Sequence, residues 1–193
     1  MKLISIILSL ATLGASAHAQ NQIEQLKQHM EQVCEASLVV RLGPDQFHDE
    51  RVMFSNVARK INETGVLRGR EIGFGLIQKN EINAWTVNMT STHSIICVPI
   101  AMVQFVHYEG ELAAIMTHET GHILNNDQGS SPKAEFRADA VGLDILIKAG
   151  YSPFDAAAAM GRFEMYSGDI HTDSKARTQF KSDTRLPQIA LSN

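Results

Sequence analysis

The chain has 193 residues, of which 44% are hydrophobic and 20% are charged, and its formal net charge is −4. This length suits one folded domain, and the composition is ordinary for a folded soluble protein and unlike that of a disordered chain. The weak negative charge, with no block of lysine or arginine, excludes the basic surface that attracts nucleic acid, so we expect no nucleic-acid partner.

The first residues have the pattern of a secretory signal peptide. Lys2 is followed by an apolar run of leucine, isoleucine and alanine, and then by an Ala-His-Ala cleavage site that ends at Ala19. The apolar run is shorter than the roughly 20 residues that span a bilayer, which argues against a membrane anchor. We therefore expect residues 1–19 to be removed, leaving residues 20–193 as a single periplasmic or secreted domain without a transmembrane segment.

Hydrophobic periodicity predicts a helix-rich chain with a small sheet in the middle, which is an α+β fold. Ser152 is the expected N-cap of the last helix, because Pro153 follows it at a first helical position. The expected helices cover residues 22–38, 49–63, 99–105, 109–125, about 134–148 and 153 onward, and the expected strands cover residues 38–42, 74–78, 84–87 and 93–99.

The chain has two cysteines, Cys34 and Cys97. In an oxidising compartment they can form a disulfide. The alternative is a pair of buried, unpaired thiols, and we slightly prefer it. The sequence gives no distance between the two side chains.

The segment THETGH contains His118, Glu119 and His122 inside an apolar, helical stretch. Residues four apart lie on one helix face, so both histidines can direct a ring nitrogen at one ion. Glu119 lies about 100° round the helix and can reach a water bound to that ion, which is the H-E-x-x-H arrangement of two zinc ligands and a general base. Gly121 costs the helix about 1 kcal/mol relative to alanine, which indicates a close approach to its backbone. The alternative is a helix with two surface histidines.

A catalytic zinc site needs a third protein ligand and an open fourth position. Glu135, in the segment EFRAD, is the candidate ligand, because an antiparallel helix pair would bring it beside the two histidines. Asp139 lies one turn further on and can accept the N–H of a ligand histidine, as an outer-shell carboxylate does. The alternative is that both carboxylates pair with Arg137 and Lys133 on a solvated face.

HETGH followed by EFRAD resembles the gluzincin peptidases that include the CAAX prenyl proteases, HtpX, the Oma-type proteases and BepA. The segments INAWTVN, GELAAIMTHETGH and DIHTDSKAR are similar to further segments of that family, so the resemblance covers roughly residues 50–180. It implies a zincin-like metallopeptidase core with a small mixed sheet, and one Zn²⁺ per chain. The implied ligands are His118, His122 and Glu135. His171 and Arg177 match a downstream motif of the family.

The resemblance implies a zinc endopeptidase that hydrolyses peptide bonds with a metal-bound water, from which Glu119 takes the proton. His171 is the candidate second donor to the oxyanion, and its alternative is an ordinary exposed histidine. We expect a peptide or unfolded-protein substrate along the edge of strand 94–98, and a role in protein quality control of the cell envelope. The alternative for this strand is a purely structural place in the core, which its apolar sequence also fits. The alternatives are a metal-bound chaperone or binding module, and a latent protease plugged by His171 or by the tail at 171–193.

Overall fold

The computed structural model describes residues 17–43, 45–67, 69–129 and 131–167. Most of the predicted signal peptide, together with His171 and Arg177, lies outside the described residues. The elements are α1 (Ala17–Cys34), the 3₁₀ turn η2 (Val39–Arg41), α2 (His48–Glu63), β1 (Glu71–Ile77), β2 (Trp85–Asn88), β3 (His93–Pro99), α3 (Ile100–Phe105), α4 (Glu109–Asn125), α5 (Pro132–Lys148) and α6 (Pro153–Ser167).

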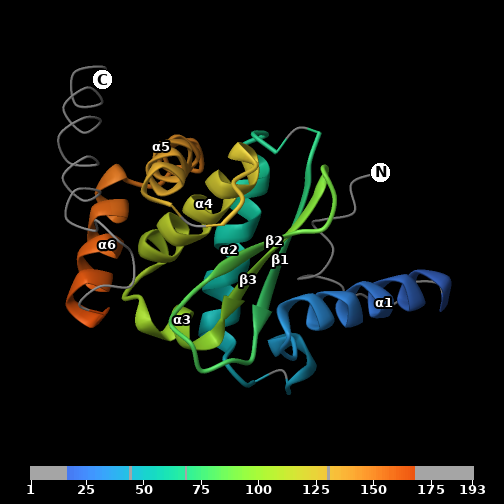
Figure 1. Cartoon of the computed structure of the whole chain (residues 1–193). Coiled ribbons are helices and arrows are strands. Elements are labelled where there is room, and N and C mark those ends of the chain that lie inside the picture. The colour runs from blue at the N-terminus through green and yellow to red at the C-terminus, as the bar shows by residue number, and fades with distance from the viewer. Residues whose placement is uncertain (1–16, 44, 68, 130, 168–193) are drawn as a thin grey trace.

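The three strands form one mixed sheet in the order β1-β3-β2. β3 lies in the centre, parallel to β1, with Phe74 opposite Ile96, and antiparallel to β2, with Trp85 opposite Cys97. Figure 1 shows α4 in the middle of the molecule, with the sheet to one side and α5 and α6 to the other. The expected helix-rich α+β fold with a small mixed sheet is confirmed.

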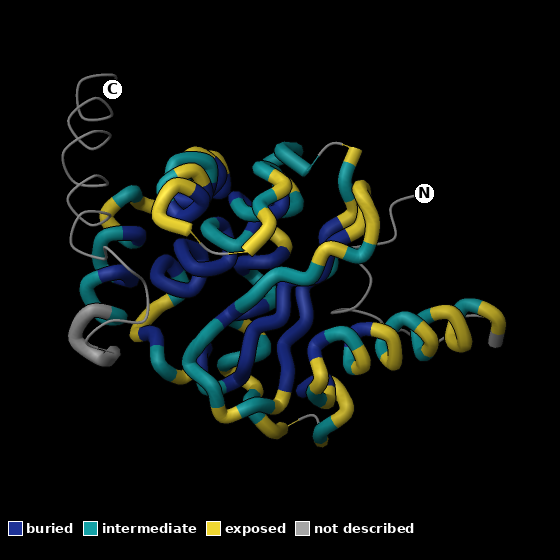
Figure 2. The backbone as a smooth tube through the Cα atoms, in the orientation of Figure 1, coloured by how far each residue is buried: buried dark blue, intermediate teal, exposed yellow. Residues whose placement is uncertain are grey.

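The core lies on both faces of the sheet. The larger part joins the sheet to α2, α3 and α4, and its fully buried side chains include Phe54, Ile96 and Met116. Figure 2 shows the central strands and α4 as buried, whereas the outer turns of α1 are largely exposed. Helix α4 is therefore one of the most buried elements of the fold, which explains its apolar sequence.

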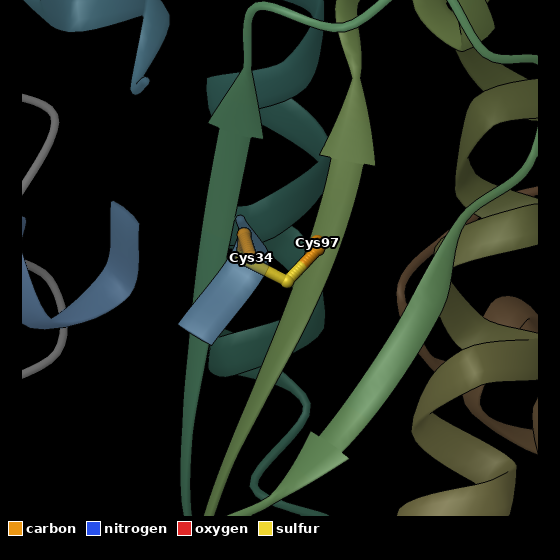
Figure 3. Close-up of a disulfide and its surroundings, with 2 residues drawn as sticks. All are labelled: Cys34 and Cys97. Atoms are coloured by element: carbon orange, nitrogen blue, oxygen red, sulfur yellow. A yellow bond between two sulfur atoms is a disulfide. The ribbon is translucent and has the colours of Figure 1, made fainter. Parts of the chain in front are cut away.

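A smaller cluster covers the other face of the sheet, where α1 packs through Met30 and Cys34. A disulfide joins Cys34 to Cys97, 63 positions later, and both residues are fully buried. Figure 3 shows it crossing from the end of α1 to β3. The slight preference for unpaired thiols is therefore wrong. Sequence spacing carried no distance, whereas the fold places the two Cα atoms 5.8 Å apart.

The predicted strand at residues 38–42 is also wrong. Leu38 makes a single antiparallel bridge to Ile77, and the chain then winds into the η2 turn. The Arg51 guanidinium donates to the carbonyls of Val39, Leu42 and Gly43, which curls this segment around one side chain. The apolar run is buried by a turn, and its pattern alone could not distinguish the two.

None of the helices in the described ranges combines the length and the apolar composition of a membrane span.

Candidate metal centre

The site is built on the last turns of α4. The helix ends in a Schellman motif, in which the N–H of Asn126 bonds to the carbonyl of Ile123 at 3.1 Å and the N–H of Asp127 bonds to that of His122 at 3.0 Å. Asn126 takes the left-handed conformation, with φ of 54°, that such an ending requires. Arg70 donates to the Ile123 carbonyl at 2.6 Å. These bonds therefore fix the last turn of α4, which carries His122.

Close packing of α4 against α5 brings the ligands together. A Cβ on Gly121 would collide with the Ala138 carbonyl and lie 2.9 Å from its Cα. A Cβ on Gly142 would lie 2.9 Å from the backbone nitrogen of His118. The backbone expected to approach Gly121 is thus that of α5, and each helix carries a glycine where the other one passes.

Two histidines and one carboxylate converge between these helices. The Nε2 atoms of His118 and His122 are 3.1 Å apart, and the Glu135 oxygens lie 3.4 Å from the first and 3.5 Å from the second. Two ligands about 2.05 Å from a tetrahedral ion lie about 3.3 Å apart, so the spacing fits Zn²⁺. The donor set of two imidazoles and a carboxylate fits it as well. The structure therefore brings together the three residues that the sequence predicts as metal ligands.

Local structure places Glu135 at the start of α5. Ser131 caps the helix by accepting from the N–H of Ala134 at 3.2 Å, and Pro132 occupies the first turn. The carboxylate thus lies at the positive end of the helix dipole, which favours a negative charge there. Glu135 is 3% exposed, so an ionised carboxylate there needs compensation from nearby positive charge.

His118 is held by Asp139, whose Oδ1 lies 2.9 Å from the histidine Nδ1. Burial acts to lower the pKa of His118, but the hydrogen bonds to Asp139 and Glu135 outweigh it and raise the pKa above its ordinary value. The contact uses Nδ1, which leaves Nε2 directed at the other two ligands. Asp139 therefore lies where the sequence placed it, beside a histidine ligand.

His122 has a carboxylate of its own, Asp127, with Oδ2 3.1 Å from its Nδ1. Asp127 is not among the residues predicted from the sequence. The available signal was an acidic residue directly after the αL residue that ends the helix. Burial, and then the nearby charge of His118, lower the pKa of His122.

The alternative that Glu135 and Asp139 lie on a solvated face and pair with neighbouring cations is wrong. Glu135 and Asp139 are buried and face the histidines. Arg137, which points out of the same helix, contacts Asp127 instead. The alternation within EFRAD therefore separates two inward carboxylates from one outward cation.

Glu119 lies on a small cavity of about 40 Å³ that it shares with His118. Helix α6 forms one wall with Met160 and Phe163, and Ala84, just before β2, lines it as well. The lining is mostly apolar, and Glu119 is half-buried at its edge. A carboxylate in this position faces a small water-sized space next to a metal ligand.

The expected substrate edge at strand 94–98 is wrong. β3 is paired on both sides, with β1 and with β2, so its main-chain groups are already used. Among the described residues, β2 has a strand partner on one side alone. Strand order, which the sequence does not state, decides which edge stays open.

An H-E-x-x-H helix with a glutamate ligand from the following helix defines a zinc metallopeptidase. Residues 54–132 match the model of peptidase family M48, a family of zinc metallopeptidases. The match ends at Pro132, before Glu135, so the third ligand rests on the geometry. A search of the curated proteins found no match.

Proposed function

We propose that the chain is an exported zinc endopeptidase that cleaves unfolded or extended polypeptides. The observation that carries this function is the convergence of His118, His122 and Glu135, with Glu119 beside them on a cavity. Bound Zn²⁺ supplies Lewis-acid chemistry, which acidifies a water and polarises a carbonyl. A purely structural metal site needs ligands and has no need of a base at position 119.

Three side chains carry the proton transfer, the positioning of a histidine ring and the binding of the oxyanion. Glu119 takes the proton of the attacking water and delivers it to the leaving amine, as a general base and then a general acid. Asp139 fixes the ring of His118 through Nδ1. His171, outside the described residues, is proposed as the second donor to the oxyanion.

The open edge of β2 supports the binding of an extended peptide. Asn83 and Ala84 immediately precede this strand and line the same cavity as Glu119, so a chain paired with β2 would pass the base. Main-chain pairing tolerates many sequences. The apolar walls, with Met160 and Phe163, favour a small apolar substrate side chain beside the scissile bond.

Export is supported by two independent features. Residues 1–19 have the pattern of a signal peptide. The buried Cys34–Cys97 disulfide belongs to an oxidising compartment such as the periplasm. In that setting a sequence-tolerant protease suits quality control of misfolded envelope proteins.

The test is cleavage of casein by the purified protein, before and after a chelator and again after zinc is returned. We expect activity that the chelator abolishes and that stoichiometric zinc restores, and a His118→Ala variant that is inactive and retains no zinc. Cleavage that persists in the chelator, or a His118→Ala protein with a full complement of zinc, would contradict the proposal.

A second candidate is a latent form of the same enzyme, and the size of the cavity favours it. About 40 Å³ is far below the roughly 300–1,000 Å³ of small-molecule sites, so a peptide needs α6 to move. Arg162 pins α6 to Glu111 of α4 at 2.6 Å. If this contact keeps the enzyme latent, Arg162→Gln raises casein turnover per bound zinc. Unchanged turnover in a folded variant argues against latency.

A further inference from the structure

We propose that Asp127, held by Arg137, positions the His122 ring and raises the affinity of the site for its metal ion. The inference rests on the proposed metal centre and extends it to two residues that touch no substrate. It gives the second histidine a support equivalent to the one that Asp139 gives the first.

The C-terminal end of α4 places Asp127 in this position. Because Asn126 takes the αL conformation and reverses the chain, Asp127 contacts His122 through both its backbone and its side chain. Its N–H bonds to the His122 carbonyl at 3.0 Å, and its Oδ2 lies 3.1 Å from the ring Nδ1. Backbone and ring of the histidine are therefore fixed by one residue, which restricts the ring to one orientation.

Burial and charge explain why Arg137 belongs to the arrangement. The Asp127 side chain is 2% exposed, and a buried carboxylate is costly without a compensating charge. Oδ2 is used by His122, and Oδ1 contacts the Arg137 guanidinium. Arg137 keeps 45% of its side chain exposed, so it closes the site from the solvent side.

The consequence for metal binding follows from the ring chemistry. With Nδ1–H donated to a carboxylate, the lone pair of Nε2 points at the cluster, and the charge behind the ring makes that nitrogen a stronger donor. Asp127 and Ser131, which lie close to each other in the sequence, both contribute to the site. Asp127 contacts His122, and Ser131 caps the helix that carries Glu135.

The experiment measures zinc affinity by competition with a chromophoric chelator, in wild type and in Asp127→Asn. Loss of an outer-shell partner typically costs about 10- to 100-fold in metal affinity, and we expect a loss of at least 10-fold here. The Co²⁺-loaded variant should also show a shifted visible spectrum, because the geometry of one ligand changes. The matched control is Asp49→Asn, which removes an aspartate at the same 3.1 Å from a histidine, but on an exposed pair.

A second variant, Arg137→Gln, guards against misfolding, since its side chain is largely outside the core. It should weaken zinc binding less than Asp127→Asn and make the affinity less sensitive to salt. If wild type binds zinc and both variants bind it equally well, Asp127 does not position His122. A wild type that binds no zinc overturns the metal centre itself, so the two failures are distinguishable.

Discussion

At the scale of single residues, each of the two site histidines is held by a carboxylate, and the helix that carries Glu135 is capped. Asp139 holds His118 and Asp127 holds His122, while Glu135 lies in a capped first turn of its helix. Asp139 belongs to α5, and Asp127 lies between α4 and α5. The two histidines on α4 therefore depend on residues outside α4 for their orientation.

Asp139→Asn tests this dependence. The asparagine keeps the size of the side chain but removes the charge behind His118, so zinc affinity should fall about 10- to 100-fold. The affinity is measured by chelator competition, and the far-UV spectrum of the metal-free protein should stay unchanged. An unaltered affinity would mean that Asp139 only fills space.

The buried pair of Glu111 and Arg162 predicts a pH dependence of stability. Burial acts to raise the pKa of Glu111, but the hydrogen bonds from Arg162 and from the N–H of His107 outweigh it and lower the pKa. Because the folded pKa lies below the unfolded value, the stabilisation is complete above that unfolded value. It is lost as the pH falls through the folded pKa.

Glu111→Gln should therefore lower the free energy of unfolding at pH 7, and the difference from wild type should shrink as the pH falls below the ordinary glutamate pKa of 4.5 and through the lowered folded pKa. Urea unfolding at several pH values measures it. Glu63→Gln is the control, because it removes a carboxylate from an exposed pair with Arg59 and should change little. A difference that stays constant with pH would show that the pair acts through packing and not through charge.

At the scale of elements, α4 and α5 approach so closely that two glycines are required. Gly142 lies against the backbone of His118, and Gly121 against that of Ala138. A methyl group at either position must push the helices apart, which moves Glu135 and Asp139 away from the histidines.

Gly142→Ala tests the close approach. Overpacking a tight contact costs about 1–3 kcal/mol, partly offset by the better helix propensity of alanine. We expect weaker zinc binding along with this destabilisation. Gly161→Ala, in α6 with open space where its Cβ would lie, is the control and should leave both quantities unchanged or slightly improve stability. Normal zinc affinity in Gly142→Ala would contradict the account of helix spacing.

The elements also show what the sequence could predict. Helices α2 and α4, and strand β3, follow from periodicity and end where local signals end them. The His118, His122 and Glu135 set follows from spacing on two helices. The open edge of the sheet, the disulfide and Asp127 depend on strand order, on distances between remote segments and on an αL turn, and a one-dimensional pattern does not contain these quantities.

At the scale of the whole molecule, the sheet lies between the candidate metal centre and the disulfide. One face packs on α2, α3 and α4, where the metal centre lies, and the other packs on α1, where the disulfide lies. α1 is tied to the sheet by Cys34 and Met30, while most of its outer turns face solvent (Figure 2). Stability and chemistry are therefore expected to respond separately to changes on the two faces.

The double variant Cys34→Ala/Cys97→Ala tests that separation. Removing a cross-link that closes a loop of 63 positions should lower the free energy of unfolding by about 2–4 kcal/mol, measured by urea titration. Zinc affinity should stay within experimental error of wild type. A loss of zinc affinity in a folded double variant would show that the two faces are coupled.

The most direct test of the central claim is casein turnover per bound zinc, measured for wild type and for Glu119→Gln. The glutamine keeps the shape of the side chain and leaves all three ligands in place, but it cannot accept the proton of water. We expect equal zinc content in the two proteins and a turnover of Glu119→Gln reduced at least about 100-fold. Equal turnover at equal zinc content would contradict this expectation.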